Sequence, residues 1–378
     1  MEFKEKPARS GEEPVLTLTE RNGFVRQADR FHKRLATEDT SNYKLVRRHD
    51  IAFNPYLLWA GAVAQNTIVD AGVISPLYPT FRVRDGHDPR FVARLLLTPQ
   101  LISAYDGIAF GSVPRRRRSS VRDFLNLPLP SIPNHDEQRR IAAILDQADA
   151  LRTKRRESLA LLDTLAQSTF HDMFGDMAPS ATVDEIAAET KGSIRTGPFG
   201  SQLLHSEFVD EGIAVLGLDN VVGNEFNWSH QRFITPSKYE ELRRYTVSPG
   251  DVLISIMGTV GRCVVVPDDI PTAINTKHIC AITVNDKQVL PEFVRACFLW
   301  HSGSRAHLRR QTKGSIMDGL NMGIIKAMPI PVPSFPLQRD FTHRAQMISA
   351  NRIGLVRASQ KANDLFTSLQ ARAFSGAL

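Results

Sequence analysis

Three short motifs contain residue types that take part in catalysis in other proteins, and each motif is incomplete. Gly258–Gly261 (Gly-Thr-Val-Gly) is a glycine-rich turn without the lysine and the spacing of a phosphate-binding loop. Asn54–Tyr56 begins like the Asn-Pro-Pro-aromatic motif of adenine methyltransferases, but it lacks the second proline. Pro267–Asp269 begins like a metal-dependent nuclease motif and lacks the second half. The motifs therefore predict a chain that is not an enzyme.

Metal and redox chemistry have equally little support. The eleven histidines show no His-x-x-x-His spacing, and Cys263, Cys280 and Cys297 form no Cys-x-x-Cys pair. Scattered thiols are typical of a reducing compartment. The N-terminal segment has no apolar signal-peptide region, and the apolar runs are too short to span a bilayer. We expect a cytoplasmic protein with no metal, no cofactor of its own and no membrane contact.

The basic residues point to a polyanionic partner. The chain has 47 Lys and Arg against 40 Asp and Glu, a formal net charge of +7. Residues 1–130 hold 20 of the basic and 14 of the acidic residues, including the run Arg115, Arg116, Arg117 and Arg118. Arginine clusters neutralise phosphates and release their counterions, so this run is a candidate contact with double-stranded DNA. A solvated charged loop is the alternative.

Loops rich in small and polar residues are the other candidate DNA contacts. Small residues let a backbone approach a phosphate closely, and Ser, Thr and Gln side chains reach phosphates or base edges. The candidates are Gly111, Ser112, Lys191, Arg195, Thr196, Gly197, Pro198, Phe199, Gly200, Ser201, Gln202, Lys313, Gly314 and Ser315. Purely structural turns are the alternative.

The elements that must position these loops occur twice. About ten short matches recur in the same order at an offset of 200 to 204 residues; Asp50-Ile51 matches Asp251-Val252, and Gln138-Arg139 matches Gln338-Arg339. A period this long excludes a solenoid and indicates a duplicated domain-plus-helix unit. The second copy has Val183–Glu211 ahead of its first matched strand, where the first copy has only Met1–Glu13. We expect a first domain that is shortened, either naturally or through a misplaced start or a truncated gene.

Each copy predicts a mixed α+β domain followed by one long helix. Runs such as Val252–Ile256 and Cys263–Val266 are β-branched and bounded by Gly, Pro and Asp, as in short strands. A proline-rich connector then precedes a helix in each copy, over about 135–173 and 337–373. The predicted segments are 1–133 and 176–336 for the two globular domains, and 134–175 and 337–378 for the helices.

Both long helices carry an apolar stripe with spacings of three and four residues. Such a stripe is typical of a coiled-coil seam, and we expect the two helices to pair antiparallel between the globular domains, as a pseudo-twofold repeat. In the alternative, each helix folds back on its own domain. The residues predicted to pair the helices or bind a partner are Ile141, Leu145, Ala148, Leu159, Leu162, Leu165, Ile348, Leu355, Leu365 and Leu369.

These motifs, taken in order, resemble the specificity subunits of type I restriction–modification systems. The helix start Asp136–Asp146 and the helix end Leu162–Gly175 resemble the conserved helix of that family. Gly192–Leu203 resembles the opening of its target recognition domains, and Val247–Leu253 fits the same domain. The resemblance covers the chain from about Pro14 to its end.

The resemblance implies a non-catalytic, DNA-binding subunit that directs DNA methylation and a type I restriction endonuclease. Two target recognition domains would each read one half of a split DNA site, and the helices would dock two methyltransferase subunits. S-adenosylmethionine, ATP and magnesium would belong to those subunits and to the restriction or motor subunit. Two departures are visible: the first domain lacks a counterpart of the Thr196–Leu203 loop, and Asp340 replaces the arginine found at Arg140. A degenerate interaction protein with one DNA-reading domain is the alternative function.

Overall fold

The chain divides into two compact units in the computed structural model. The structure describes residues 2–7, 12–20, 22–30, 39–111, 117–228, 231–312 and 319–378. Unit 1 comprises the residues up to Arg156 together with Arg357–Leu378, and unit 2 comprises Glu157–Val356. Both units contain helices and mostly antiparallel sheets, so the predicted α+β class is confirmed. This division splits both long helices between the units, and the four predicted segments stay a prediction.

Unit 1 contains one four-stranded antiparallel sheet and two strand pairs. The sheet has the order β1 (Glu2–Phe3), β8 (Thr80–Phe81), β5 (Ile51–Phe53) and β6 (Val63–Gln65). The pairs are β2 (Leu16–Thr19) with β3 (Gly23–Arg26) and β4 (Lys44–Arg47) with β7 (Ala71–Ile74). Leu16 and Leu18 alternate with threonines along β2 and pack with Val46 and Ile74, as expected for a half-buried strand.

Short helices cover the sheet of unit 1 and connect it to the long helices. They are α1 (Gln27–Arg30), η1 (Leu58–Ala60), α2 (Pro89–Leu96), α3 (Pro99–Gly107) and α4 (Val121–Leu125). Asp88 caps α2, because its carboxylate accepts hydrogen bonds from the N–H groups of Arg90 and Phe91. Phe91 and Leu95 then enter the core that unit 1 builds around Phe53.

Unit 2 contains two larger sheets and one strand pair. The four-stranded antiparallel sheet has the order β10 (Ile194–Thr196), β18 (Ile279–Ile282), β15 (Val252–Ser255) and β16 (Cys263–Val265). The five-stranded sheet has the order β11 (Phe208–Val209), β13 (Phe233–Ile234), β12 (Ile213–Leu216), β17 (Ala273–Asn275) and β14 (Thr246–Val247), with β12 and β17 parallel. β9 (Ala181–Thr182) pairs with β19 (Pro329–Ile330). Every residue of β15 and β18 is buried, so both faces of this sheet are covered.

The shorter helices of unit 2 share its aromatic core with the two long helices. They are α6 (Val183–Ile186), α7 (Pro236–Leu242), α8 (Pro291–Trp300), α9 (Ser302–Thr312) and α10 (Met322–Lys326), with the 3₁₀ turns η3 (Gly200–Gln202), η4 (His205–Glu207), η5 (Leu218–Asn220) and η6 (Arg243–Tyr245). Phe293 of α8 is buried in one cluster with Val252 and Ile254 of β15. This cluster ties the sheet to the helices.

Two long helices, α5 (His135–Phe174) and α11 (Phe335–Ser375), contribute to both units. Asn134 starts α5, because its side-chain oxygen accepts a hydrogen bond from the N–H of Glu137 at 3.0 Å. Gly175 follows the last helical residue, and a Cβ there would lie 2.6 Å from the carbonyl oxygen of His171. No helix in the described ranges has both the length and the apolarity needed to cross a bilayer.

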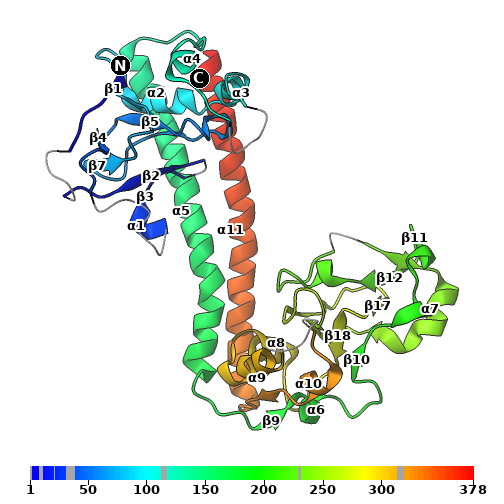
Figure 1. Ribbon diagram of the computed structural model, residues 1–378. Coiled ribbons are helices and arrows are strands. Elements are labelled where there is room, and N and C mark those ends of the chain that lie inside the picture. The colour runs from blue at the N-terminus through cyan, green and yellow to red at the C-terminus, as the bar shows by residue number, and fades with distance from the viewer. Residues whose placement is uncertain are drawn as a thin grey trace. The chain divides into compact units, whose positions relative to one another are not determined.

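In unit 1 the segments of α5 and α11 run antiparallel and lie side by side (Figure 1). Arg140 donates a hydrogen bond to the carbonyl oxygen of Leu378 at 2.9 Å, and Arg152 donates one to the side chain of Asn363 at 3.0 Å. The guanidinium of Arg152 also lies 4.2 Å from the centroid of the Phe366 ring. A cation held over an aromatic face in this way stabilises the helix pair.

The same antiparallel arrangement holds within unit 2. Arg352 of α11 forms an ion pair with Asp163 of α5 at 2.6 Å. Further along, the ring of Phe341 lies edge-on to Phe170 and Phe174, with centroid distances of 5.5 and 5.7 Å. Such edge-to-face contacts are the favoured geometry of aromatic pairs, and they fix the register of the two helices in this unit.

The predicted apolar positions along the two helices differ in their burial. Ile141 and Leu145 are buried, and six of the predicted residues are partly buried: Ala148, Leu159, Leu162, Ile348, Leu355 and Leu369. Leu165 and Leu365 are 45% and 49% exposed, so partner binding rather than helix pairing stays the prediction for these two. Phe366, 9% exposed, takes the inward position beside Leu365. A spacing of three or four residues fits both Leu365 and Phe366. The phenylalanine ring takes the inward position because it buries more apolar surface than the leucine.

A glutamine at the start of each long helix makes the same contacts in both units. The side chain of Gln138 accepts a hydrogen bond from the backbone N–H just before α2 and donates one to the carbonyl of Pro133 at 2.8 Å. Gln338 accepts one from the N–H just before α8 and donates one to the carbonyl of Pro333 at 2.9 Å. The sequence repeat therefore has a structural counterpart where each helix leaves its domain.

A single glycine in the interior of α11 provides a test of the helix in unit 2. Nothing lies within 4 Å of a Cβ built on Gly354, so Gly354→Ala should raise the free energy of unfolding of unit 2 by about 0.5–1 kcal/mol. Urea unfolding followed by circular dichroism measures the change. A loss of stability would mean that this face of α11 is covered.

Candidate nucleic-acid interface

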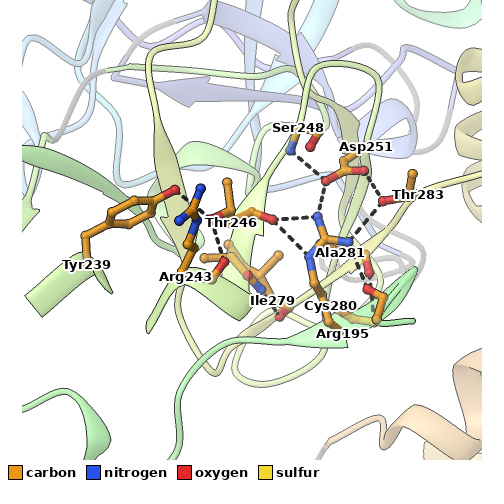
Figure 2. A network of polar contacts seen from close by, with 12 residues as sticks. Arg195, Tyr239, Arg243, Thr246, Ser248, Asp251, Ile279, Cys280, Ala281 and Thr283 are labelled. Carbon is orange, nitrogen blue, oxygen red and sulfur yellow. Dashed lines mark hydrogen bonds and ion pairs between the residues drawn. The ribbon is translucent and has the colours of Figure 1, made fainter. Parts of the chain in front are cut away.

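A buried ion pair anchors the strand that leads into the Thr196–Leu203 loop. Arg195 lies on β10, and its side chain is 12% exposed. The guanidinium forms an ion pair with Asp251, whose side chain is fully buried at the start of β15. Figure 2 shows this pair at the centre of a polar network that also includes Thr246 and Thr283.

The network satisfies both carboxylate oxygens of Asp251 and all five N–H donors of Arg195. Asp251 accepts hydrogen bonds from the backbone N–H of Ser248 at 2.8 Å and from the hydroxyl of Thr283 at 2.5 Å. Arg195 donates twice to the carbonyl of Thr246, at 3.0 and 2.7 Å, and once each to Gly192, Thr283 and Asp251. A guanidinium has five donors, so none remains for a phosphate.

The DNA contact predicted for Arg195 is therefore corrected. The residue positions the loop by joining β10 to the β14–β15 connection, and it does not present its charge to solvent. Sequence reasoning took the arginine as a surface cation because its partner, Asp251, lies 56 residues away in the chain.

Gly197 allows the same loop to lie directly on the turn between β17 and β18. A Cβ at this position would lie 2.0 Å from the carbonyl oxygen of Asn275 and 2.4 Å from the carbonyl carbon of Thr276. Real Cβ atoms do not approach backbone atoms this closely, so only glycine fits. Gly197 and Pro198 are buried and Thr196 is partly buried, so this part of the loop is structural.

The exposed end of the loop carries the groups that can meet a ligand. Phe199 is 46% exposed, and Gly200, Ser201 and Gln202 are exposed on η3. The side-chain oxygen of Gln202 accepts a hydrogen bond from the hydroxyl of Tyr245 at 2.8 Å. The guanidinium of Arg244 lies 4.8 Å from the centroid of the Tyr245 ring and donates to its hydroxyl at 2.8 Å. We call Phe199, Gln202, Arg244 and Tyr245 the unit 2 aromatic–basic surface.

Unit 1 has a comparable group beside its arginine run. The guanidinium of Arg117 lies 5.3 Å from the centroid of Trp59, and that of Arg118 lies 5.7 Å from the centroid of Tyr56. Arg118 pairs with Phe110 through two backbone hydrogen bonds of 3.0 and 2.9 Å, and Phe110 is 59% exposed. We call Tyr56, Trp59, Phe110, Arg117 and Arg118 the unit 1 aromatic–basic surface.

The two arginines of this surface differ in their freedom to bind an anion. Arg117 donates to the carboxylate and the carbonyl of Asp106 at 2.6 and 2.8 Å, and its side chain is 22% exposed. Arg118 is exposed, with its guanidinium held over Tyr56. Arg118 is therefore the better candidate for a phosphate contact.

Several predicted contacts lie outside the described residues: Ser112, Arg115, Arg116, Lys313, Gly314 and Ser315. Gly111 and Lys191 are described and exposed. For all of these residues a DNA contact stays a prediction.

In unit 1 a different arginine pairs with the buried aspartate. β1 pairs with β8 as β10 pairs with β18, so a strand does stand in the place of β10. Asp50, the counterpart of Asp251, is 2% exposed and is bound by both Arg82 Nε and Nη2, at 2.9 and 3.0 Å. Arg82 lies near the position that Thr283 holds in the second copy. In both copies an arginine therefore pairs with the buried aspartate, from β10 in unit 2 and from the residue that follows β8 in unit 1.

The cysteines and the possible metal ligands were the other candidates for chemistry in the described part of the chain. Cys263, Cys280 and Cys297 are buried, and burial raises the pKa of the Cys280 thiol to about 12, so it is not a thiolate at neutral pH. Among the described residues, no group of three His, Cys, Asp or Glu side chains is placed to hold a metal ion.

Sequence reasoning missed several members of both surfaces. Tyr56, Trp59, Arg244 and Tyr245 were not predicted as ligand contacts. Arg244 and Tyr245 are adjacent in sequence, and a basic residue next to an aromatic one is the available signal. For Trp59 and Arg117 no such signal exists, because the fold alone brings them together.

Comparison with known proteins gives one similar sequence and a shared fold. No family model matches the chain. Over 176 residues the chain is 25% identical to the specificity subunit of the type I restriction enzyme EcoBI from Escherichia coli. The matched region covers 45% of this chain and 36% of that relative, so it spans about a third of the relative's length.

Two solved structures cover nearly the whole chain. One is the S subunit of a type I restriction–modification system from M. genitalium, with 14% identity and a TM-score of 0.59, covering 99% of this chain and 93% of that one. The other was solved to explain complex assembly and conformational transition in a type I R-M system; it has 15% identity and a TM-score of 0.56 and covers 100% and 95%. The resemblance to type I specificity subunits that the motifs indicate is confirmed.

Proposed function

We propose that this chain is the DNA-binding specificity subunit of a type I restriction–modification system, with one target recognition domain in each unit. The observation that carries the proposal is the aromatic–basic surface that each unit exposes. Arginine held over an aromatic ring offers a cation for phosphate and a face for a base, which is the combination that nucleic-acid sites use. The likeness in sequence and fold to specificity subunits supports the same function.

Two reading units are favoured over the alternative with only one. Unit 1 keeps its own aromatic–basic surface, and its β1 strand stands where β10 stands in unit 2. We therefore propose a target in two halves with an unread gap. An α-helix of 40 residues measures about 60 Å, which equals about 18 base pairs of B-DNA, so helices of this length suit a divided target.

The long helices are proposed to dock two methyltransferase subunits. Within unit 2, Leu161, Met347 and Ile353 are 70%, 53% and 51% exposed along α5 and α11. Large apolar side chains that the helices expose to solvent would be covered in a protein interface. S-adenosylmethionine is proposed to bind those partners, and ATP and magnesium to bind the partners or a restriction subunit, while this chain performs no catalysis.

The arginines of unit 1 provide the binding test. Arg118→Ala should weaken binding to duplex DNA and lower the slope of log Kd against log salt by roughly one, because one phosphate contact is lost. Arg117→Ala should have a smaller effect, because Asp106 already neutralises that side chain. Fluorescence anisotropy over a salt series measures both. Arg139→Ala, an exposed arginine on α5, is the matched control. An equal loss of affinity in all three variants would indicate general charge and contradict the assignment.

A further inference from the structure

Unit 2 contains a pocket whose lining includes no residue of the unit 2 aromatic–basic surface. Its volume is about 550 Å³, within the range of sites for drug-sized ligands. It lies between the turn from β15 to β16, the helices α8 and α9, and one turn of α5. All of its lining residues belong to unit 2.

The pocket is basic, with no acidic residue in its lining. Arg262, Arg305 and Arg309 contribute three guanidinium groups. Arg262 is exposed and forms no ion pair with any residue in the described part of the chain. Arg305 donates a hydrogen bond to the carbonyl of Leu299 at 2.8 Å. A cavity lined by three arginines suits an anion with several oxygens, above all a phosphate.

The turn that carries Arg262 is built in advance of any ligand. Ser255, fully buried, donates a hydrogen bond to the carbonyl of Thr259 and accepts one from the N–H of Arg262 at 2.9 Å. Gly258 and Gly261 have φ of 75° and 81°, a conformation that favours glycine. Nothing lies within 4 Å of a Cβ built on Gly261, so the turn faces open space. A fixed turn lowers the entropy lost when its arginine binds a ligand.

The floor of the pocket is apolar and aromatic. Trp300 is partly buried, with its ring centroid 5.9 Å from that of Phe170. Phe298 and Leu308 are buried beside it. An indole in the lining of a cavity that also has arginines in its lining is a candidate stacking surface for a base. Gln167 and Asn224 add polar groups that can contact the edge of a base.

The three arginines are specific to the second copy. At every offset from 200 to 204 residues, the first copy has no basic residue opposite Arg262, Arg305 or Arg309. A Cβ built on Gly61 would be in ordinary contact with the side chain of Ile102 at 3.7 Å, whereas one on Gly261 would meet nothing within 4 Å. A role in folding that both copies share therefore does not explain these arginines.

We propose that this pocket binds a nucleotide, with the arginines on the phosphate and Trp300 against the base. The nucleotide is either a free mononucleotide or one nucleotide of a DNA strand, and both present the same chemistry. The version of the proposal with a free mononucleotide does not depend on the proposed DNA-specificity function.

Calorimetric titration of the full chain with AMP, with adenosine as the matched probe, tests the free form. The wild-type chain should bind AMP at one site and adenosine at least about tenfold more weakly, because charge-assisted contacts are lost. Arg262→Ala should weaken AMP binding by about tenfold or more, and Arg262→Lys should retain part of it. Arg243→Ala removes a 73%-exposed arginine of the same unit and should change nothing.

A second arm uses duplex and single-stranded DNA with the same variants. If AMP does not bind, and Arg262→Ala weakens DNA binding several-fold more than Arg243→Ala does, the nucleotide belongs to a DNA strand. AMP binding without DNA binding would support the pocket and contradict the proposed specificity function. The pocket assignment is overturned if AMP does not bind and Arg262→Ala and Arg243→Ala bind DNA alike, provided that circular dichroism shows both variants folded.

Discussion

Arg195→Ala should lower the free energy of unfolding of unit 2 by about 3–5 kcal/mol. The substitution leaves the carboxylate of Asp251 buried and without its cation, and uncompensated buried charges are costly. It also removes two hydrogen bonds to the carbonyl of Thr246. The ion pair joins β10 to the start of β15, so the loss should loosen the strand that leads into the Thr196–Leu203 loop.

Urea unfolding followed by tryptophan fluorescence and circular dichroism measures this effect. Arg195→Lys keeps the charge but loses the forked geometry, and we expect an intermediate loss of stability. Arg243→Ala, an exposed arginine in the same unit, should change the free energy by no more than about 0.5 kcal/mol. If the Arg195→Ala variant is as stable as this control but binds DNA more weakly, Arg195 contacts DNA and the structural role is contradicted.

Gly197→Ala should be the most damaging single-methyl substitution in unit 2. The added Cβ would meet backbone atoms at 2.0 and 2.4 Å, and backbone cannot move aside as a side-chain end can. We expect either a loss of stability of roughly 1–3 kcal/mol, the usual cost of overpacking, or a displaced loop. Because the exposed Phe199 and Gln202 follow directly, DNA affinity should fall in the same variant.

Thermal unfolding and anisotropy with duplex DNA separate these two effects. Gly354→Ala makes the same chemical change in open space on α11 and is the matched control. A Gly197→Ala variant that matches the control in both stability and DNA affinity would show that the loop does not lie on the β17–β18 turn.

The sequence was sufficient to predict the long helices, because their boundaries have local causes. The expected span 135–173 agrees with His135–Phe174, since Asn134 and Gly175 act next to the residues they delimit. The second helix begins at Phe335, two residues earlier than expected, because Pro336 is tolerated in a first helical turn. The strands at Val252 and Cys263 were also placed correctly, from their β-branched runs.

The site could be predicted only in part, because its key contacts are non-local. The loop after β10 was identified, but the burial of Arg195 depends on Asp251 and Thr283, which other strands supply. The apolar stripe of the helices was found, yet it could not distinguish Leu365 from Phe366, since both fit the spacing. Residue type indicates which side chains can do chemistry, and tertiary contacts decide which of them face a ligand.

Mapping of methylated adenines in cells with and without this gene tests the DNA-specificity function most directly. With the gene and its methyltransferase partner present, we predict one methylated motif in two halves separated by a fixed unread gap. Alanine substitution of Arg118 should reduce methylation of every copy of that motif. Methylation that is unchanged after deletion of the gene, or that shows no divided motif, would contradict the account.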